Sequence, residues 1–193
     1  MYYNWKTTIN SKELENVKKL INNGEIIVFP TETVYGIGAN AFNSEAVKKI
    51  FFAKGRPSDN PLIVHVANKQ TIGELVEVQS AVEQLLIDAF MPGPITIILK
   101  KKKIIPDIVS AGLETVGIRM PSNEIANKII ETSGVPIAAP SANISGRPSG
   151  THIEDIRSEL EEKVAVVIDG GESDIGLEST VVKVIDNIPT ILR

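Results

Sequence analysis

The stretch Lys54–Leu62, KGRPSDNPL, separates an apolar pattern typical of a helix from an apolar run typical of a strand. Its two cations, Lys54 and Arg56, are one residue apart, and Pro57 and Pro61 enclose a short run of small polar residues. Proline restricts the backbone and cannot continue a helix, so the segment is predicted to be a stiff loop. We expect this loop to present positive charge at the edge of a sheet.

The two patterns joined by this loop alternate along most of the chain. Before it, a helix is predicted to begin at Asn43 or Ser44, and after it LIVHVA predicts a strand at residues 62–67. Further strands are predicted at residues 26–29, 95–99, 115–120, 136–140, 164–169, 179–185 and 190–192, and further helices at 10–23, 71–76, 80–90, 123–133 and 151–163. Alternation of this kind predicts an α/β fold with helices on both faces of a sheet. Because no helix separates the last strands, part of the sheet is expected to be antiparallel.

Composition limits the classes of protein and site. The 193 residues contain 42% hydrophobic and 23% charged residues, as in ordinary globular proteins, and residues 1–193 are predicted to form one domain. The absence of cysteine excludes disulfides, thiolate zinc sites and cysteine nucleophiles. No apolar run is long enough to span a bilayer, so we expect a cytoplasmic protein with no membrane partner. A net charge of −4 disfavours a surface that coats nucleic acid but permits a local basic groove. The run Lys100–Lys103 is interpreted as a solvated strand end.

A second loop, Pro140–Thr151 (PSANISGRPSGT), has related chemistry. It leads into a predicted helix start, where free N–H groups attract anions, and its Ser141, Asn143 and Ser149 add polar side chains. The chain has no GxxxxGK[ST] loop and no complete GxGxxG fingerprint, so a phosphate site must use cations and a helix start. We interpret the two loops as jointly holding a nucleoside triphosphate. The alternative is a pair of solvated cations and an ordinary polar turn.

Four other residues have unusual positions for their type. Arg119 lies within a predicted strand, and a partly buried arginine requires an anion, either an internal carboxylate or the carboxylate of a substrate. His65, in an apolar strand, is either a core histidine or a ligand contact. Thr33 lies in a loop predicted at 31–38, after a strand, where open α/β sheets bind ligands, and Ser179 begins a predicted strand.

Taken together, five segments resemble the YrdC-like L-threonylcarbamoyladenylate synthase family. They are PTETVYGIG, KGRPSDNPL, TVGIRMP, PIAAPSANISGRPSGT and STVV, in this order, and the similarity extends from about Ser11 to Arg193. The resemblance implies an open, twisted, mixed parallel and antiparallel sheet with a concave, positively lined cavity. Some members of the family continue through a linker into a second domain, so the chain is either a short form or part of a longer protein.

The resemblance also implies an activity. A nucleotidyltransferase of this kind forms threonylcarbamoyl-AMP and pyrophosphate from L-threonine, bicarbonate or CO2, and ATP. The product is the activated donor for threonylcarbamoyladenosine in tRNA, which a partner threonylcarbamoyl transferase complex makes. No cluster of carboxylates marks a protein metal site, so Mg²⁺ is expected to be carried mainly by the phosphates of the substrate ATP.

Site residues are carried over by motif in three groups. The catalytic, nucleotide-handling group is Lys54, Arg56, Ser141 and Asn143. The ATP-binding group is Arg56, Asn60, Thr115, Ser141, Ser149 and Arg193. The L-threonine-binding group is Thr33, His65, Arg119, the backbone at Ala139, and Ser179.

Two other functions compete with this one. A double-stranded RNA- or tRNA-binding module, or a ribosome-assembly protein, would use the same basic cavity, with affinity that falls steeply with salt and needs no ATP. Carbamoyl transfer to another acceptor occurs in the related domain of hydrogenase-maturation proteins. The lack of cysteine-based zinc motifs disfavours that second alternative.

Overall fold

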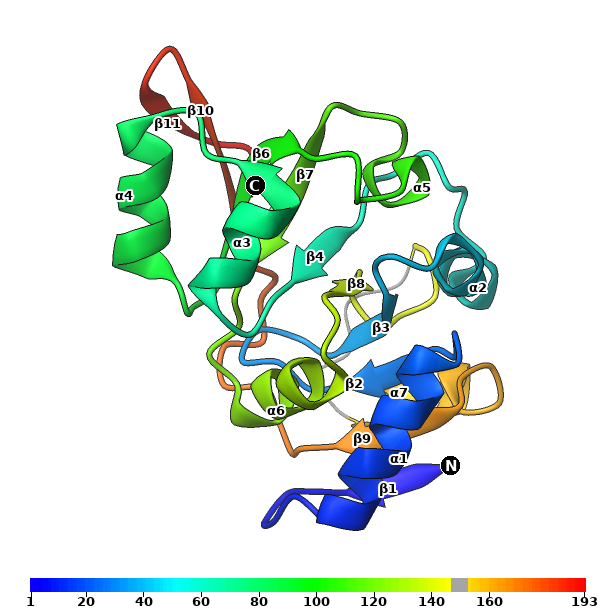
Figure 1. The fold of residues 1–193 in the computed structure, drawn as a ribbon. Helices are drawn as coiled ribbons and strands as arrows, with labels where there is room; N and C mark the ends of the chain where they lie inside the picture. Colours follow the sequence, from blue (N-terminus) through cyan, green and yellow to red (C-terminus); the bar gives the residue numbers. More distant parts are fainter. Residues whose placement is uncertain (147–152) are drawn as a thin grey trace.

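The computed structural model describes residues 1–146 and 153–193. Within these ranges, eleven strands form one mixed sheet in the order β1-β9-β2-β3-β8-β4-β7-β6-β10-β11, with β5 paired to β6 (Figure 1). The strands are β1 Tyr2–Asn4, β2 Ile27–Phe29, β3 Gly36–Asn40, β4 Ile63–His65, β5 Val76–Glu77, β6 Ile95–Lys101, β7 Thr115–Arg119, β8 Ile137–Ala139, β9 Val166–Asp169, β10 Thr180–Ile185 and β11 Ile188–Ile191. The predicted α/β class with a mixed sheet is confirmed.

The helices begin where the sequence supplies a side chain that caps free N–H groups. They are α1 Ser11–Asn22, α2 Ser44–Lys54, α3 Lys69–Leu75, α4 Ala81–Phe90, α5 Asp107–Ser110, α6 Glu124–Ser133 and α7 Ile153–Leu160. Asn10 caps α1, but Glu13, three residues later, does not return a hydrogen bond to the cap to form a reciprocal capping box. Its carboxylate instead accepts a hydrogen bond from Trp5 Nε1 at 2.6 Å, because the buried indole N–H needs an acceptor.

Two hydrophobic cores lie on opposite faces of the sheet, as the alternation along β2 shows. Ile27 and Phe29 belong to a smaller core, which α1 and α6 cover, whereas Val28 belongs to a larger core. The larger core contains apolar residues from the remaining helices, among them Val47, Ile72, Leu86, Val109 and Ile156. Helices therefore cover both faces, as predicted.

Strand β7 carries side chains to the functional face of the sheet. Val116 and Ile118 belong to the larger core, and the alternating residues Gly117 and Arg119 lie on the opposite face. The neighbouring strand β4 is parallel to β7 and places His65 in register with Arg119. The fold thus brings two polar residues, 54 positions apart, next to each other in the interior.

Strand β3 was not predicted, because its sequence GIGAN reads as part of a loop. Packing requires glycine at Gly38, since a Cβ atom there would lie 2.6 Å from Ile137 Cγ2 and 2.7 Å from Phe29 Cε1. The strand therefore fits between β2 and β8 only without side chains at this point. The short elements β1, β5 and α5 were also not predicted.

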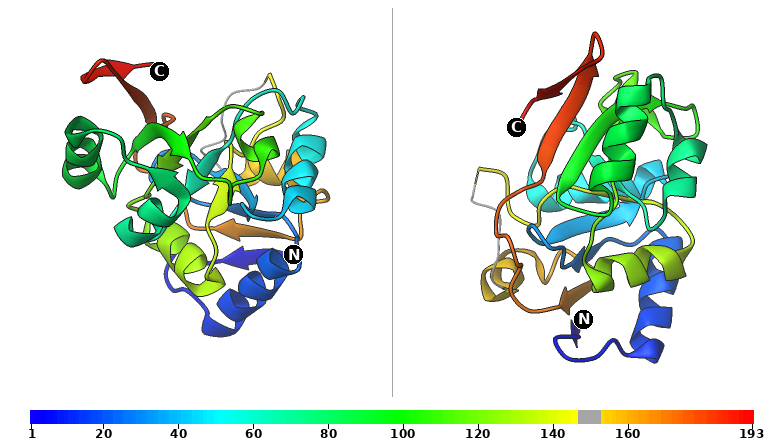
Figure 2. Two further views of the ribbon diagram at one scale, coloured as in Figure 1. Left: turned by 45° about the horizontal axis from the view of Figure 1, so that its top comes forward. Right: turned by 90° about the vertical axis from the view of Figure 1, so that its left-hand side faces the viewer.

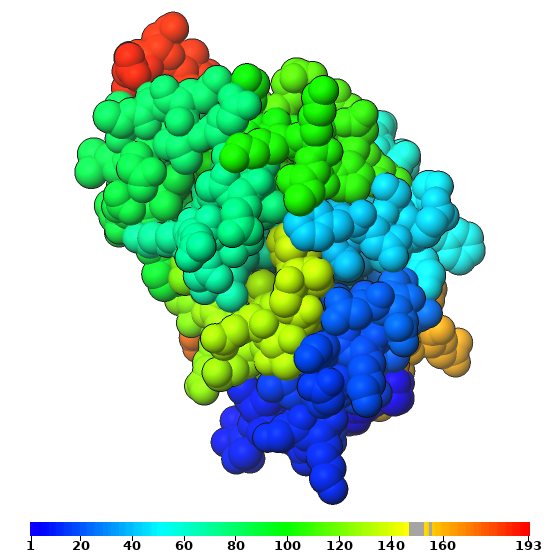
Figure 3. Space-filling model, viewed as in Figure 1, coloured from blue at the N-terminus to red at the C-terminus, as the bar shows by residue number. Residues whose placement is uncertain are grey.

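The two last strands form an antiparallel hairpin, as predicted. Asp186 and Asn187 make its tight turn at positive φ, and the hairpin projects from the rest of the molecule (Figures 2 and 3). On its inner side, β10 runs parallel to β6. The hairpin carries the chain from Ser179, at the functional face, out to the surface and back to Arg193.

The lysine run covers the last two residues of β6 and the two that follow; Lys102 and Lys103 are exposed, as expected, whereas the side chain of Lys101 is only 12% exposed. Lys100 pairs with Glu77 and Lys101 with Asp107, each at 2.8 Å. Across the described part of the chain, no helix combines the length and apolar character needed to cross a membrane.

Candidate functional site

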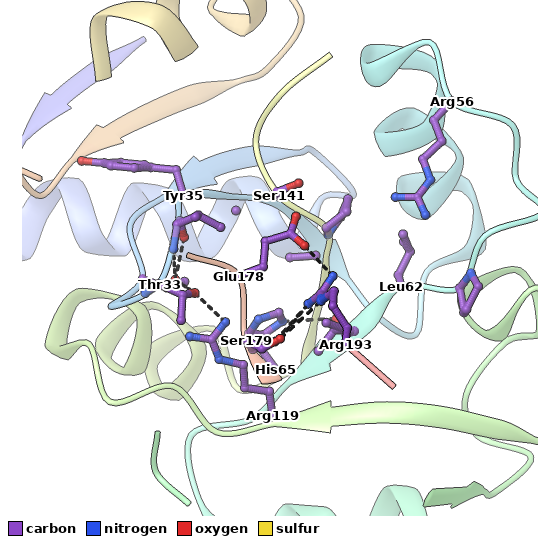
Figure 4. Close-up of a pocket in the computed structure, with 17 residues that line it drawn as sticks. Thr33, Tyr35, Arg56, Leu62, His65, Arg119, Ser141, Glu178, Ser179 and Arg193 are labelled. Carbon is purple, nitrogen blue, oxygen red and sulfur yellow. Dashed lines mark hydrogen bonds and ion pairs between the residues drawn. The ribbon is translucent and has the colours of Figure 1, made fainter. Parts of the chain in front are cut away.

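A pocket opens on the face of β4 and β7 opposite the larger core (Figure 4). Its walls come from the loop after β2, the loop between α2 and β4, the end of β8, the residues before β10, and the last residue of the chain. Strands β4 and β7 form its floor. The lining residues are Thr31, Thr33, Val34, Tyr35, Gly36, Arg56, Pro61, Leu62, Ile63, His65, Arg119, Ala139, Pro140, Ser141, Glu178, Ser179 and Arg193.

Backbone hydrogen bonds bring these walls together. Ser141 pairs with Gly36 in an isolated antiparallel bridge, and Ala142 N donates to Tyr35 O at 2.7 Å. Gly176 N donates to Thr33 O at 3.0 Å, which attaches the segment before β10 to the loop after β2. Three segments distant in sequence are therefore fixed around one hollow by main-chain contacts.

Most of the residues expected from the sequence meet in this pocket. Those that line it are Thr33, Arg56, His65, Arg119, Ala139, Ser141, Ser179 and Arg193. In Figure 4, Arg119 and Thr33 lie on one side of the pocket and Arg56 on the other. The expected convergence is confirmed, while the role of each residue stays a prediction.

Arg119 is almost fully buried and has an internal partner. Its Nη2 lies 2.8 Å from Glu32 Oε1, and its Nη1 donates to Thr33 Oγ1 at 2.9 Å. Of the two anions that the sequence left open, the structure therefore contains the internal carboxylate. Glu32 was not predicted as a site residue, because no spacing in the sequence links it to Arg119, 87 positions away. We call Glu32, Thr33, His65 and Arg119 the Arg119 end of the pocket.

The hydroxyl of Thr33 can only accept a hydrogen bond from a ligand. Thr31 Oγ1 donates to Val34 O at 2.6 Å, so Thr31 must accept the proton of Thr33 across their 3.0 Å contact. Arg119 already donates to the same Thr33 oxygen. A ligand that contacts Thr33 Oγ1 must therefore bring a donor, such as an ammonium group or a hydroxyl.

His65 is a neutral imidazole at neutral pH. Burial, followed by the charge of Arg119, lowers the pKa of His65 to about 3. The ring lies 3.2 Å from Ile63 O through Nδ1 and meets Phe29 edge to face. It lines the pocket and contributes shape and hydrogen bonding, but no charge.

Arg193 lies between the two sides of the pocket and is also paired. Its Nη1 lies 2.6 Å from Glu178 Oε2, and its Nη2 donates to Ser179 O at 3.0 Å. The hydroxyl of Ser179 contacts Thr96 Oγ1 at 2.8 Å. Glu178 was not predicted, and its position directly before the STVV segment was the only signal in the sequence.

Lys54 does not line the pocket, which corrects the expectation that its loop presents two cations. Only 2% of Lys54 is exposed, and its Nζ donates to the backbone carbonyls of Ser141 and Asn143. Burial, followed by the charge of Arg56, lowers the pKa of Lys54 to about 8. Ser141 Oγ in turn donates to Asn143 Oδ1 at 2.6 Å. Lys54 and Asn143 therefore hold the loop that presents Ser141.

Two expected ATP contacts do not line this pocket, and a third falls outside the described residues. Asn60 is exposed on the loop after α2, and Thr115 begins β7 opposite Lys100. Ser149 lies outside the described residues, as does Thr151, the first residue of the last predicted helix. Within residues 1–146 and 153–193, no group of three or more histidine or acidic side chains is arranged to hold a metal ion.

Comparison with known proteins gives consistent matches. The family model Sua5/YciO/YrdC, described as telomere recombination, matches residues 19–193. Proteins named threonylcarbamoyl-AMP synthase are 49% identical over 173 residues in Pyrococcus abyssi, covering 90% of this chain and 51% of that protein, and 48% identical over 185 residues in Bacillus subtilis, covering 95% and 54%. The chain thus spans about half the length of these two relatives.

A solved structure matches the whole chain. The crystal structure of P. abyssi Sua5 complexed with L-threonine superposes with a TM-score of 0.96 at 44% identity, covering 100% of this chain and 57% of that one.

Proposed function

The chain belongs to the Sua5/YciO/YrdC family, and on that basis we propose that its pocket forms threonylcarbamoyl-AMP and pyrophosphate from L-threonine, bicarbonate or CO2, and ATP. The observation that carries this proposal is the meeting of Arg56, Arg119 and Arg193 in one pocket. Joining a carbamate to a triphosphate brings two anions together, and such a step needs fixed positive charge. The names of the relatives and the threonine complex of P. abyssi Sua5 support the same function.

Threonine is assigned to the Arg119 end of the pocket. Its carboxylate would lie at Arg119, and its ammonium would donate to Thr33 Oγ1, which has only acceptor capacity left. The threonine site would be completed by His65, the backbone at Ala139, and Ser179.

ATP is assigned to the other side, with phosphates near Arg56, Ser141 and Arg193. Asn60, Thr115 and Ser149 are kept as further ATP contacts. Lys54 and Asn143 act through the loop that carries Ser141. Among the described lining residues Glu178 is the one carboxylate, and it pairs with Arg193, which suits Mg²⁺ carried mainly by the phosphates. Bound there, Mg²⁺ would neutralise part of the phosphate charge.

The proposed reaction has two steps. The ammonium group of threonine first loses one proton to solvent. The resulting amine loses a second proton to solvent as its nitrogen bonds to the carbon of CO2, which gives a carbamate. A carbamate oxygen then bonds to the α-phosphorus of ATP while the bond to pyrophosphate breaks. The protein supplies alignment of the reactants and charge neutralisation, because two anions would otherwise repel each other.

Pyrophosphate release from ATP and bicarbonate tests the proposal. We expect release that depends on threonine and is much slower with serine or without an amino acid. Omission of bicarbonate, with threonine and ATP present, is the matched control and should also stop release. Release that is indifferent to the amino acid would refute the synthase function.

The wider setting belongs to the same proposal. We propose that residues 1–193 form a single catalytic domain in the cytoplasm, whose product goes to a threonylcarbamoyl transferase complex for tRNA modification. The RNA-binding alternative is not favoured, because the relatives are named as synthases and a solved relative is complexed with L-threonine.

Lys54 gives this function a specific pH dependence. Its pKa of about 8, against 10.5 for an ordinary lysine, means that the unfolded chain binds the extra proton between these values, so this group makes folding more favourable as pH rises through the interval. Activity is expected to fall over the same interval, because a neutral amine holds the carbonyls of Ser141 and Asn143 less strongly. The measurement is kcat/KM from pH 7 to 10, with melting temperature recorded alongside.

The substrates also titrate in this range, so the control is Lys54→Arg, which keeps its charge. Each protein is normalised to its own activity at pH 7. We expect the wild type to lose activity above about pH 8 relative to this variant. Identical normalised profiles would show that Lys54 does not set the alkaline limit.

A further inference from the structure

The ion pair between Glu32 and Arg119 is buried next to the pocket. The side chains are each 5% exposed, and Nη2 of Arg119 lies 2.8 Å from Oε1 of Glu32. Apart from this ion contact, Oε2 of Glu32 and Nε of Arg119 have no hydrogen-bond partner in the described part of the chain. Buried charged atoms with so few partners are costly, so the pair is expected to serve something beyond stability.

The described residues at the Arg119 end carry no net charge. Arg119 contributes one positive charge and Glu32 one negative charge, while His65 is neutral. The remaining polar group of this end is the hydroxyl of Thr33, which contacts the hydroxyl of Thr31. A ligand that enters this end therefore contacts the guanidinium of Arg119, which is paired with Glu32, and the hydroxyl oxygen of Thr33, which can only accept a hydrogen bond.

We propose that Glu32 is a specificity-determining residue, which balances Arg119 and so makes this end select a zwitterionic α-amino acid over a carboxylic acid that lacks the amine. The proposal rests on the function proposed above and adds a role for a residue outside the expected site. In a buried site the dielectric constant is low, so a ligand charge that is not balanced interacts strongly with the charges of Arg119 and Glu32. A zwitterion leaves the net charge at zero, whereas a carboxylate without an ammonium group adds a negative charge that Glu32 opposes.

The test compares L-threonine with 3-hydroxybutyrate, which keeps the carboxylate and the hydroxyl and replaces the amine with hydrogen. Dissociation constants are measured by calorimetry for the wild type and for Glu32→Gln. We expect the wild type to prefer threonine by at least about tenfold, since like charges brought together in a buried site cost that much or more. In Glu32→Gln this preference should shrink by about tenfold, because Arg119 then has no opposing charge.

Two further measurements separate charge selection from a structural role. Glu32→Asp keeps the charge and should keep the preference for threonine, even where both ligands bind more weakly. Circular dichroism checks that each variant folds. If Glu32→Gln does not fold, Glu32→Met, which is uncharged and close to glutamate in length, takes its place in the same comparison.

The outcomes that overturn the inference are distinct from failure of the proposed function. Threonine binding with the same preference in the wild type and Glu32→Gln contradicts the role of Glu32 alone. So does wild-type affinity for 3-hydroxybutyrate equal to that for threonine. No threonine binding to the wild type contradicts the proposed function, and this inference with it.

Discussion

Replacement of Arg56 by alanine is expected to lower the rate of threonine-dependent pyrophosphate release by about 100- to 1000-fold, the usual effect of removing one fixed charge-stabilising donor from a transition state. Arg56 lines the pocket from the end of α2, and no ion pair to another described residue engages it. Its guanidinium is therefore available to phosphate oxygens. The melting temperature should change little, because Arg56 is only half-buried.

The matched control is Arg157→Ala on α7. Arg157 pairs with Glu161 at 3.0 Å and lies over the ring of Tyr2. The control variant therefore removes an arginine side chain from a position outside the pocket. We expect near-normal pyrophosphate release from this variant. Near-normal release from Arg56→Ala as well would remove Arg56 from the proposed nucleotide site.

Replacement of Arg119 by glutamine is expected to abolish threonine binding and to lower the free energy of unfolding by about 3–5 kcal/mol. The stability loss follows from Glu32, which would keep a buried carboxylate without its cation. Loss of binding follows because Arg119 is the only cation at its end of the pocket among the described residues. Urea unfolding and calorimetry with L-threonine measure the two effects.

The double variant Glu32→Gln with Arg119→Gln separates them. Removing both charges leaves no unpaired ion, so most of the lost stability should return, while threonine binding should stay absent. A single Arg119→Gln variant that is as stable as the wild type would mean that the pair with Glu32 is not retained in solution.

The helices and strands near the pocket were largely predictable, because periodicity and capping residues are local signals. Arg119 shows what a local signal can and cannot provide. Its place in an apolar strand required a partner anion, but the partner lies 87 positions away at Glu32, which no spacing rule identifies. The pairing depends on how β4, β7 and the loop after β2 are assembled.

Lys54 shows a second limit. The sequence places it at the end of a helix next to Arg56, and both were expected to face the ligand. Gly55, at φ 60°, ends the helix in a left-handed conformation, and Lys54 Nζ meets carbonyls 87 and 89 positions away. Which cation faces the pocket is thus decided by tertiary contacts rather than by composition.

Strand β3 shows a third. Its glycines read as a loop, yet the lack of a side chain at Gly38 is what lets β3 lie between β2 and β8. The site residues taken together came from the resemblance to a family, since spacing alone would not have joined Thr33, Arg119 and Ser179. Geometry then added Glu32 and Glu178, which the motifs do not single out.

The most direct measurement of the central claim is a crystal structure of this chain with L-threonine and a non-hydrolysable ATP analogue bound together. We expect the amino-acid carboxylate at Arg119 and the phosphates beside Arg56 and Ser141, within one continuous pocket. Ligands in two separate cavities, or either ligand away from these arginines, would contradict the account.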